Sequence, residues 1–141
     1  MTLRKLIFFL TFIIAFFAIT CNDSLNECLS GPGNTIIKRQ SLYDFNNIRV
    51  KDNISLTIVN GTKNELAISA GENIIHMIGI EIENNTLILS NKSTCPIIKD
   101  PWNNIEMKIK VKDIDTIFIE SHGILKSNEP FEDDDLTIRI S

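Results

Sequence analysis

Apolar and polar residues alternate in short runs from Thr35 onward. A period of two sends neighbouring side chains to opposite faces of a strand, so the pattern predicts strands with one buried and one solvated face. Isoleucine supports this, because 22 of the 26 Ile follow Cys21 and β-branched residues favour pleated surfaces. The alternating apolar positions are Ile48 and Val50; Ile54, Leu56 and Ile58; Leu66, Ile68 and Ala70; Ile80 and Ile82; Leu87 and Leu89; Ile105, Met107, Ile109 and Val111; Ile117 and Ile119; and Leu136, Ile138 and Ile140. We therefore predict an all-β domain.

Turn-forming residues separate these runs. They are Asp52-Asn53, Asn60-Gly61, Asn84-Asn85 and Asp113. The segment Val59–Thr62 predicts a tight hairpin between the strands around Ile54 and Leu66. The segment Gly71–Ile78 breaks the alternation and predicts a single helical turn. His76 lies in it, and we interpret it as an exposed turn residue rather than a catalytic base.

Strands spaced by 8 to 12 residues are typical of a sandwich, a barrel or a solenoid, and periodicity does not choose among them. Two features favour a solenoid. The stretches Ile117–Ile119 and Leu136–Ile138 start 19 residues apart, close to one coil of a β-helix. The sequence also ends inside a predicted strand, at Arg139-Ile140-Ser141.

The first twenty residues have the pattern of a targeting segment. Arg4 and Lys5 precede the apolar run Leu6–Thr20, which contains five of the eight Phe. This run of 15 residues has signal-peptide length and is shorter than the ~20 residues that cross a bilayer. We predict that residues 1–20 are a lipoprotein signal peptide and that the mature chain is exported.

Cys21 follows the small and apolar residues Ala18-Ile19-Thr20, an arrangement similar to a lipobox. The thiol would then carry diacylglycerol, and Cys21 would be the first mature residue, anchored to a membrane through its acyl chains. The alternatives are an ordinary signal peptide with an incidental cysteine, or an uncleaved anchor. Residues 21–33 are polar and contain Gly and Pro, so they predict a tether. The β domain would then occupy residues 34–141.

Three cysteines are an odd number for an exported chain. If Cys21 is acylated, Cys28 and Cys95 remain as a pair in an oxidising compartment. A disulfide between them would close a loop of 68 residues and stabilise the fold by roughly 4 kcal/mol. The alternative is two free thiols. We expect no metal site, because there is no CxxC motif and both His are far from a cysteine in the sequence.

The charge balance restricts the classes of partner that the chain can bind. The chain has a net charge of −4, and removal of residues 1–20 leaves 12 basic against 18 acidic residues, a net charge of −6. An acidic chain with dispersed Lys and Arg is a poor nucleic-acid binder, so we expect no nucleic-acid partner. A hydrophobic content of 43% and a charged content of 23% exclude wholesale disorder.

A series of short segments in order resembles the head GIN domain family, described as "putative auto-transporter adhesin" and found as lipoproteins of Gram-negative bacteria. The matching segments are Gly31-Pro32-Gly33, Arg39 with Leu42–Ile48, Asn53–Ile58, Ala70–Ile75, Asn85–Leu89, and Asn91-Lys92 before Cys95 and Trp102. The resemblance covers residues 28–141. It implies a right-handed β-solenoid-like stack of short strands with a β-rich opening section, and a Cys28–Cys95 disulfide. It implies no catalytic residue or cofactor, because the family has no established active site.

Two departures from the family pattern affect the expected architecture. Family members continue for several more rungs, whereas this sequence stops at Ser141, and Glu120–Gly123 replaces the small residues usual at that bend. An open last strand invites pairing with another chain. We therefore expect either a truncated form of a longer domain or a chain that needs a partner.

The favoured hypothesis is a non-enzymatic lipoprotein of the cell envelope, placed at the outer membrane, with its orientation left open. It would act as an adhesin or scaffold that binds an envelope protein, a glycan or itself through a rigid face. One alternative is a carbohydrate-active β-helix enzyme. Such an enzyme needs paired carboxylates, for which Glu81 and Glu83 are candidates, or an acid with a basic partner, for which Glu106 with Lys108 and Lys110 are candidates. Another is an accessory of envelope-stress signalling.

Three further features have plainer interpretations. The run Glu132–Asp135 lacks the spacing of a calcium loop and is interpreted as a solvated acidic turn. We interpret Trp102 as a cover for the core rather than a sugar platform, and His122 as a bend residue rather than a ligand.

Overall fold

A computed structural model describes residues 31–93, 105–130 and 136–141. Strands dominate these residues, which confirms the all-β prediction. The elements are β1 (Thr35–Ser41), β2 (Asn47–Asp52), β3 (Ile54–Asn60), β4 (Glu65–Gly71), the 3-10 turn η1 (Ile75–Met77), β5 (Ile78–Glu83), β6 (Thr86–Asn91), β7 (Ile105–Val111), β8 (Thr116–Ser121), β9 (Leu125–Ser127) and β10 (Thr137–Ile140). Within this part of the chain, no helix is long and apolar enough to cross a membrane.

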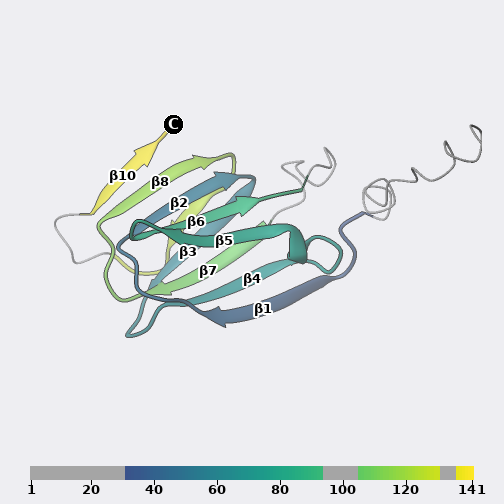
Figure 1. The fold of residues 1–141 in the computed structure, drawn as a ribbon, viewed down its shortest axis with the longest axis horizontal. Coiled ribbons are helices and arrows are strands. Elements are labelled where there is room, and N and C mark those ends of the chain that lie inside the picture. Colours follow the sequence, from purple (N-terminus) through teal and green to yellow (C-terminus); the bar gives the residue numbers. More distant parts are fainter. Residues whose placement is uncertain (1–30, 94–104, 131–135) are drawn as a thin grey trace, which may run out of the picture.

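The strands form two five-stranded mixed sheets (Figure 1). Sheet A has the order β1-β4-β7-β3-β9, and sheet B has the order β10-β8-β2-β6-β5. Parallel pairs occupy the β7-β3-β9 side of sheet A and the β10-β8-β2-β6 side of sheet B. Antiparallel strands complete each sheet, β1 and β4 in sheet A and β5 in sheet B. Neither sheet closes into a barrel within the described residues.

The chain crosses from one sheet to the other at corresponding points. β2 in sheet B leads into β3 in sheet A, and β8 leads into β9 in the same way. β8 lies parallel to β2 with Ile117 opposite Ile48, and β9 lies parallel to β3 with Leu125 opposite Leu56. The crossings also contact each other, because the His122 N–H donates to the Asp52 carbonyl at 2.9 Å. The strand pairs β2–β3 and β8–β9, which are separated in the chain by β4 to β7, are therefore stacked in register.

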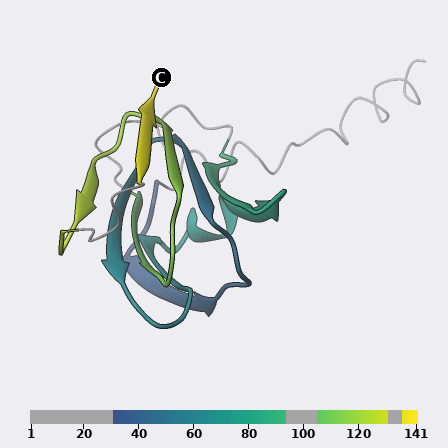
Figure 2. The same cartoon turned by 90° about the vertical axis from the view of Figure 1, so that its left-hand side faces the viewer.

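The core lies between the two sheets. Figures 1 and 2 show the arrangement of the strands from perpendicular directions. Alternate residues of β2, β3, β4, β6, β7 and β8 point inward, as the period of two predicts. Sheet A contributes Ile54, Leu56, Ile58, Leu66, Ile68, Ala70, Ile105, Met107, Ile109 and Val111. Sheet B contributes Ile48, Val50, Leu87, Leu89, Ile117 and Ile119. β7 has the clearest alternation, with every inward residue buried and every outward residue exposed.

The predicted hairpin between the strands around Ile54 and Leu66 is wrong. β3 and β4 belong to the same sheet, but β7 lies between them, parallel to β3 and antiparallel to β4. The turn residue Gly61 donates its N–H to the Val111 carbonyl of β7 at 2.8 Å instead of closing a two-strand hairpin. The sequence signal gave the position of the turn correctly and its pairing partner incorrectly.

The turn at Asn84-Asn85 does close a hairpin, between the antiparallel strands β5 and β6. Asn84 and Asn85 have φ angles of 47° and 62°. Positive φ at both central residues is the type I′ geometry that matches strand twist, and Asn tolerates it. The predicted helical turn is also confirmed, as η1.

The period-two pattern does not identify every strand. β1 is exposed along most of its length, and β9 has three residues, so neither shows a clear apolar alternation. The sequence predicted that the strands starting at Ile117 and Leu136 are equivalent, with an offset of 19 residues. β10 is indeed parallel to β8, but Ile117 lies opposite Ile138 and not opposite Leu136.

Candidate functional site

The outer face of sheet A carries a row of aligned side chains that crosses all five strands. Its members are Arg39 of β1, Ala67 of β4, Lys108 of β7, Thr57 of β3 and Lys126 of β9. Each lies directly opposite the next across the sheet. We call these five residues the basic row. Three cations alternate with two small residues along it.

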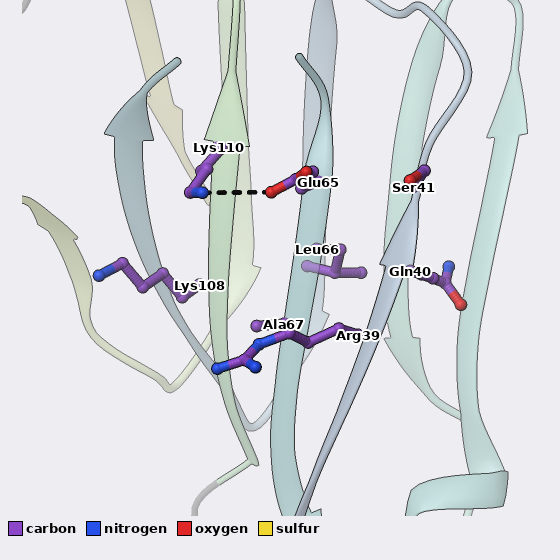
Figure 3. A pocket seen from close by; sticks show the side chains of 8 residues that line it. All are labelled: Arg39, Gln40, Ser41, Glu65, Leu66, Ala67, Lys108 and Lys110. Atoms are coloured by element: carbon purple, nitrogen blue, oxygen red, sulfur yellow. Dashed lines mark hydrogen bonds and ion pairs between the residues drawn. The ribbon is translucent and has the colours of Figure 1, made fainter. Parts of the chain in front are cut away.

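Two adjoining hollows open over this face. They have volumes of about 560 and 460 Å³ and share Arg39, Ala67 and Lys108. The hollows exist because Ala67 and the serine and threonine residues nearby are short, while the long side chains of the row rise around them. Figure 3 shows Arg39 extending from β1 across β4 over Ala67, with Lys108 beyond it on β7.

The first hollow contains one ion pair. Lys110 Nζ lies 3.2 Å from Glu65 Oε2 (Figure 3). In contrast, Arg39, Lys108 and Lys126 form no ion pair with any residue that the structure describes. All three are exposed. The basic row therefore presents three positive charges to solvent on an acidic protein.

Besides the cations of the basic row, the second hollow is lined by hydroxyl groups, by apolar side chains and by the carboxylate of Glu106. Ser55, Thr57 and Ser69 supply the hydroxyls, and Ile37 and Ile124 lie at its ends. Ser55 Oγ accepts a hydrogen bond from the Ile124 N–H at 3.1 Å. The hydroxyl of Ser55 thereby keeps its own proton to donate to a ligand. Ile37 and Ile124 are 63% and 59% exposed, so they offer apolar contact beside the charges.

The outer face of sheet B carries a different cluster, in which the aromatic ring is covered. Arg49 and Arg139 lie over the ring of Phe118, with guanidinium carbons 4.8 and 5.8 Å from its centre. Arg49 also pairs with Glu120 at 2.9 Å. The face of the Phe118 ring is therefore occupied by cation–π contacts, and the charge of Arg49 is paired within the protein. We interpret this cluster as stabilising the sheet rather than as a binding platform.

Of the carboxylates proposed for enzymatic chemistry, Glu106 lines the second hollow, whereas Glu81 and Glu83 lie apart from both hollows. Glu81 and Glu83 belong to β5, at the edge of sheet B. Lys92 donates a hydrogen bond to the Glu81 carboxylate. This hydrogen bond and the charge of Lys92 lower the pKa of Glu81, and the charge of Lys51 acts in the same direction. Glu81 is therefore held ionised, the opposite of the tuning that a general acid needs.

Several residues of the sequence interpretation lie outside the described residues. They are Cys21, Cys28, Cys95, Trp102 and Glu132–Asp135. His76 and His122 are both exposed, at η1 and in the bend after β8. In the described parts of the chain, no three His, Cys, Asp or Glu side chains are grouped as metal ligands.

The prediction that Glu106, Lys108 and Lys110 share one outer face is confirmed by β7. Sequence reasoning missed Arg39 and Lys126, which join Lys108 in the basic row. Alternation predicts that such residues face outward. It does not predict that Arg39 and Lys126, which are 87 positions apart in the chain, lie in one row across the sheet.

The comparisons with known proteins agree with the fold. A family model described as "Putative auto-transporter adhesin, head GIN domain" matches residues 44–141, more than two thirds of the chain. The chain belongs to the head GIN domain family. This confirms the family resemblance drawn from the sequence, and the family carries an adhesin description rather than an enzymatic one.

Solved structures with related folds include two described as putative adhesins. One, from Parabacteroides merdae ATCC 43184, has 20% identity and a TM-score of 0.64, with 78% of this chain and 45% of that chain covered. The other, from Bacteroides fragilis NCTC 9343, has 21% identity and a TM-score of 0.65, with coverages of 75% and 49%.

A third similar structure is described as a "Putative lipid binding protein" from Parabacteroides distasonis ATCC 8503. It has 17% identity and a TM-score of 0.50, and the match covers 67% of this chain and 42% of that chain. The head GIN chain spans about half the length of the solved structures it matches. At these identities the similarity shows the fold alone. A search of curated proteins found no significant match.

Proposed function

We propose that this head GIN chain is a non-enzymatic adhesion domain of the cell envelope that binds a macromolecule on the outer face of sheet A. The observation that carries this proposal is the continuity of the two hollows, which share Arg39, Ala67 and Lys108. The basic row crosses five strands, so the face is longer than a small-molecule site and suits an extended ligand. The adhesin description of the family supports the same function.

The carboxylates on this face favour binding over hydrolysis. Glu65 lies opposite Lys110, and Glu106 lies four residues earlier on β7. Four residues of strand separate their backbone positions by roughly 13 Å, whereas glycosidases hold their two carboxyl groups about 5 to 9.5 Å apart. Glu65 is also occupied by its ion pair with Lys110. The face therefore supports recognition of a ligand without the carboxylate pair of a glycosidase.

The proposed architecture is a β-solenoid in which successive coils contribute one strand to each sheet. The stacked pairs β2–β3 and β8–β9 support it, since each strand of one pair is parallel to its equivalent in the other. β10 would begin the next coil beside β8. Such a stack holds outward side chains at regular positions, which suits a rigid binding face.

Binding on this face can be tested with two matched substitutions. Ala67→Tyr places a bulky ring in the middle of the hollows, whereas Ile88→Tyr places the same ring on the outer face of sheet B. We expect the full chain to bind a member of a panel of envelope glycans, envelope proteins and its own copies, and only Ala67→Tyr to abolish that binding. Circular dichroism would check that both variants fold. A wild-type chain that binds nothing in the panel and stays monomeric would contradict the proposal.

The anchor is also part of the proposal: residues 1–20 are removed, Cys21 is acylated, and Cys28 pairs with Cys95. The polar tether would then hold the domain off the outer membrane. Intact mass of the protein from its own membranes, with and without reductant, tests both modifications. We expect cleavage before Cys21, added acyl mass, and a gain of two hydrogens on reduction. An unacylated chain with three titratable thiols would exclude both.

A further inference from the structure

The geometry points to an acidic polysaccharide as the ligand, lying across the strands along the basic row and bound through carboxylate or sulfate groups. This inference rests on the proposed function, because it names the ligand class of the same face. It depends on the spacing of the cations, on their lack of protein partners, and on the groups between them.

The cations of the basic row start from evenly spaced backbone positions. Arg39, Lys108 and Lys126 lie on β1, β7 and β9, and one strand separates each from the next. Strands in a sheet are about 4.8 Å apart, so successive cations start about 10 Å apart at the backbone. That interval is comparable to the length of a disaccharide. A glycan with one anionic group per disaccharide could therefore meet all three cations.

The three cations are available to a ligand. None forms an ion pair with a residue in the described parts of the chain, whereas Lys110 on the same face is paired with Glu65. Figure 3 shows the Arg39 side chain lying across Ala67. Its guanidinium can therefore donate two parallel hydrogen bonds to a carboxylate above the sheet. Charge complementarity thus favours an anionic ligand on this face.

The remaining groups suit sugars. The hydroxyls of Ser55, Thr57 and Ser69 can exchange hydrogen bonds with sugar hydroxyls, and Ile37 and Ile124 can contact the apolar faces of sugar rings. A single glycan chain also fits better than a flat anionic membrane. A membrane would press its phosphates against both Glu65 and Glu106, whereas a single chain along the basic row lies between these two carboxylates and contacts the hydroxyls and isoleucines of the neighbouring positions.

The test uses the full chain in detergent and an immobilised oligogalacturonate, with its methyl ester as a neutral ligand of the same backbone. We expect binding to the acid and not to the ester. Lys108→Gln, Arg39→Gln and Lys126→Gln should each weaken binding about fivefold or more, as expected for the loss of one charge contact. Lys112→Gln is the matched control, since this lysine follows the end of β7 and lies outside both hollows.

One substitution is expected to tighten binding instead of weakening it. Glu106→Gln removes the anion nearest to Lys108 along β7, so it should tighten binding a fewfold. Raising the ionic strength to about 1 M, where the Debye length is about 3 Å, should weaken binding.

Equal binding of acid and ester, or unchanged binding in all three cation variants, would overturn the acidic-glycan inference. Binding to phosphatidylglycerol vesicles but not to the oligosaccharide, with loss in the same variants, would also overturn it in favour of a membrane surface. In either case, Ala67→Tyr still tests the proposed binding face separately. A neutral ligand displaced by Ala67→Tyr would leave the proposed function intact.

Discussion

At the scale of single residues, buried amides join the end of β6 to the crossing between β2 and β3. Asn91 at the end of β6 donates its side-chain amide to Asn53 Oδ1 at 2.9 Å, and its own Oδ1 accepts the Ser93 N–H at 3.0 Å. All three residues are buried. Buried polar groups need such partners, because their desolvation is otherwise uncompensated. These hydrogen bonds help to hold the end of β6 against the crossing between β2 and β3.

The substitution Asn91→Ala should lower the free energy of unfolding by about 1 to 3 kcal/mol, because it deletes two buried hydrogen bonds. Urea denaturation followed by circular dichroism would measure the change. Asn128→Ala, at an exposed position, is the control and should stay within about 0.5 kcal/mol of the original chain. Equal stability of the two variants would show that the Asn91 side chain does not support the crossing.

Among the described residues, Glu81 has a lowered pKa because it forms an ion pair with Lys92. Because the pKa of Glu81 is lowered in the folded state, the contribution of this pair to stability is present above the ordinary pKa of 4.5 and is lost as pH falls through the folded-state pKa. Lys92→Met should raise the pKa of Glu81 towards its ordinary value. Carboxyl NMR titration would measure the rise. Lys51→Met should cause a smaller one, and an unchanged pKa in Lys92→Met would contradict the assignment.

At the scale of elements, the bend from β8 to β9 depends on a close backbone approach. A Cβ atom at Gly123 would lie 1.9 Å from the carbonyl oxygen of Ile54. Ser121 fixes the same bend, because its Oγ donates to the Ile54 carbonyl and accepts the Gly123 N–H, both at 2.9 Å. Glycine therefore lies at the position in Glu120–Gly123 where the backbones meet.

Gly123→Ala should therefore destabilise the fold by about 1 to 3 kcal/mol, since backbone atoms have to move apart. Gly61→Ala is a milder substitution for comparison, because a Cβ there would lie 3.2 Å from the Lys110 Cβ. Thermal unfolding of both variants would rank them. A smaller loss for Gly123→Ala than for Gly61→Ala would be inconsistent with the close approach at the bend.

At the scale of the whole molecule, β3 occupies a central place in sheet A. It pairs in parallel with β7 on one side and β9 on the other, and its inward residues lie in the core between the sheets. β10 lies at the edge of sheet B, with all its residues exposed. The stability of the domain should therefore depend far more on inward residues of β3 than on β10.

Leu56→Ala should cost about 2 to 5 kcal/mol, because it removes a fully buried side chain and leaves a cavity. Ile140→Ala, at a side chain that is 80% exposed, should change stability by no more than about 0.5 kcal/mol. Chemical denaturation of the two variants would measure the difference. Similar losses would mean that β10 contributes to the core more than its exposure indicates.

The amino-acid pattern alone determined most of the strands, though not β1 and β9, and the faces of their side chains. Alternation predicted the outward positions of Glu106, Lys108 and Lys110, and the Asn84-Asn85 pair predicted its turn, because side-chain direction and turn geometry depend on neighbouring residues. Only the tertiary structure decided that β7 separates β3 from β4, and that Arg39 and Lys126 align with Lys108. Backbone hydrogen-bonding groups are nearly identical in every strand, so pairing partners are selected by packing of the entire core.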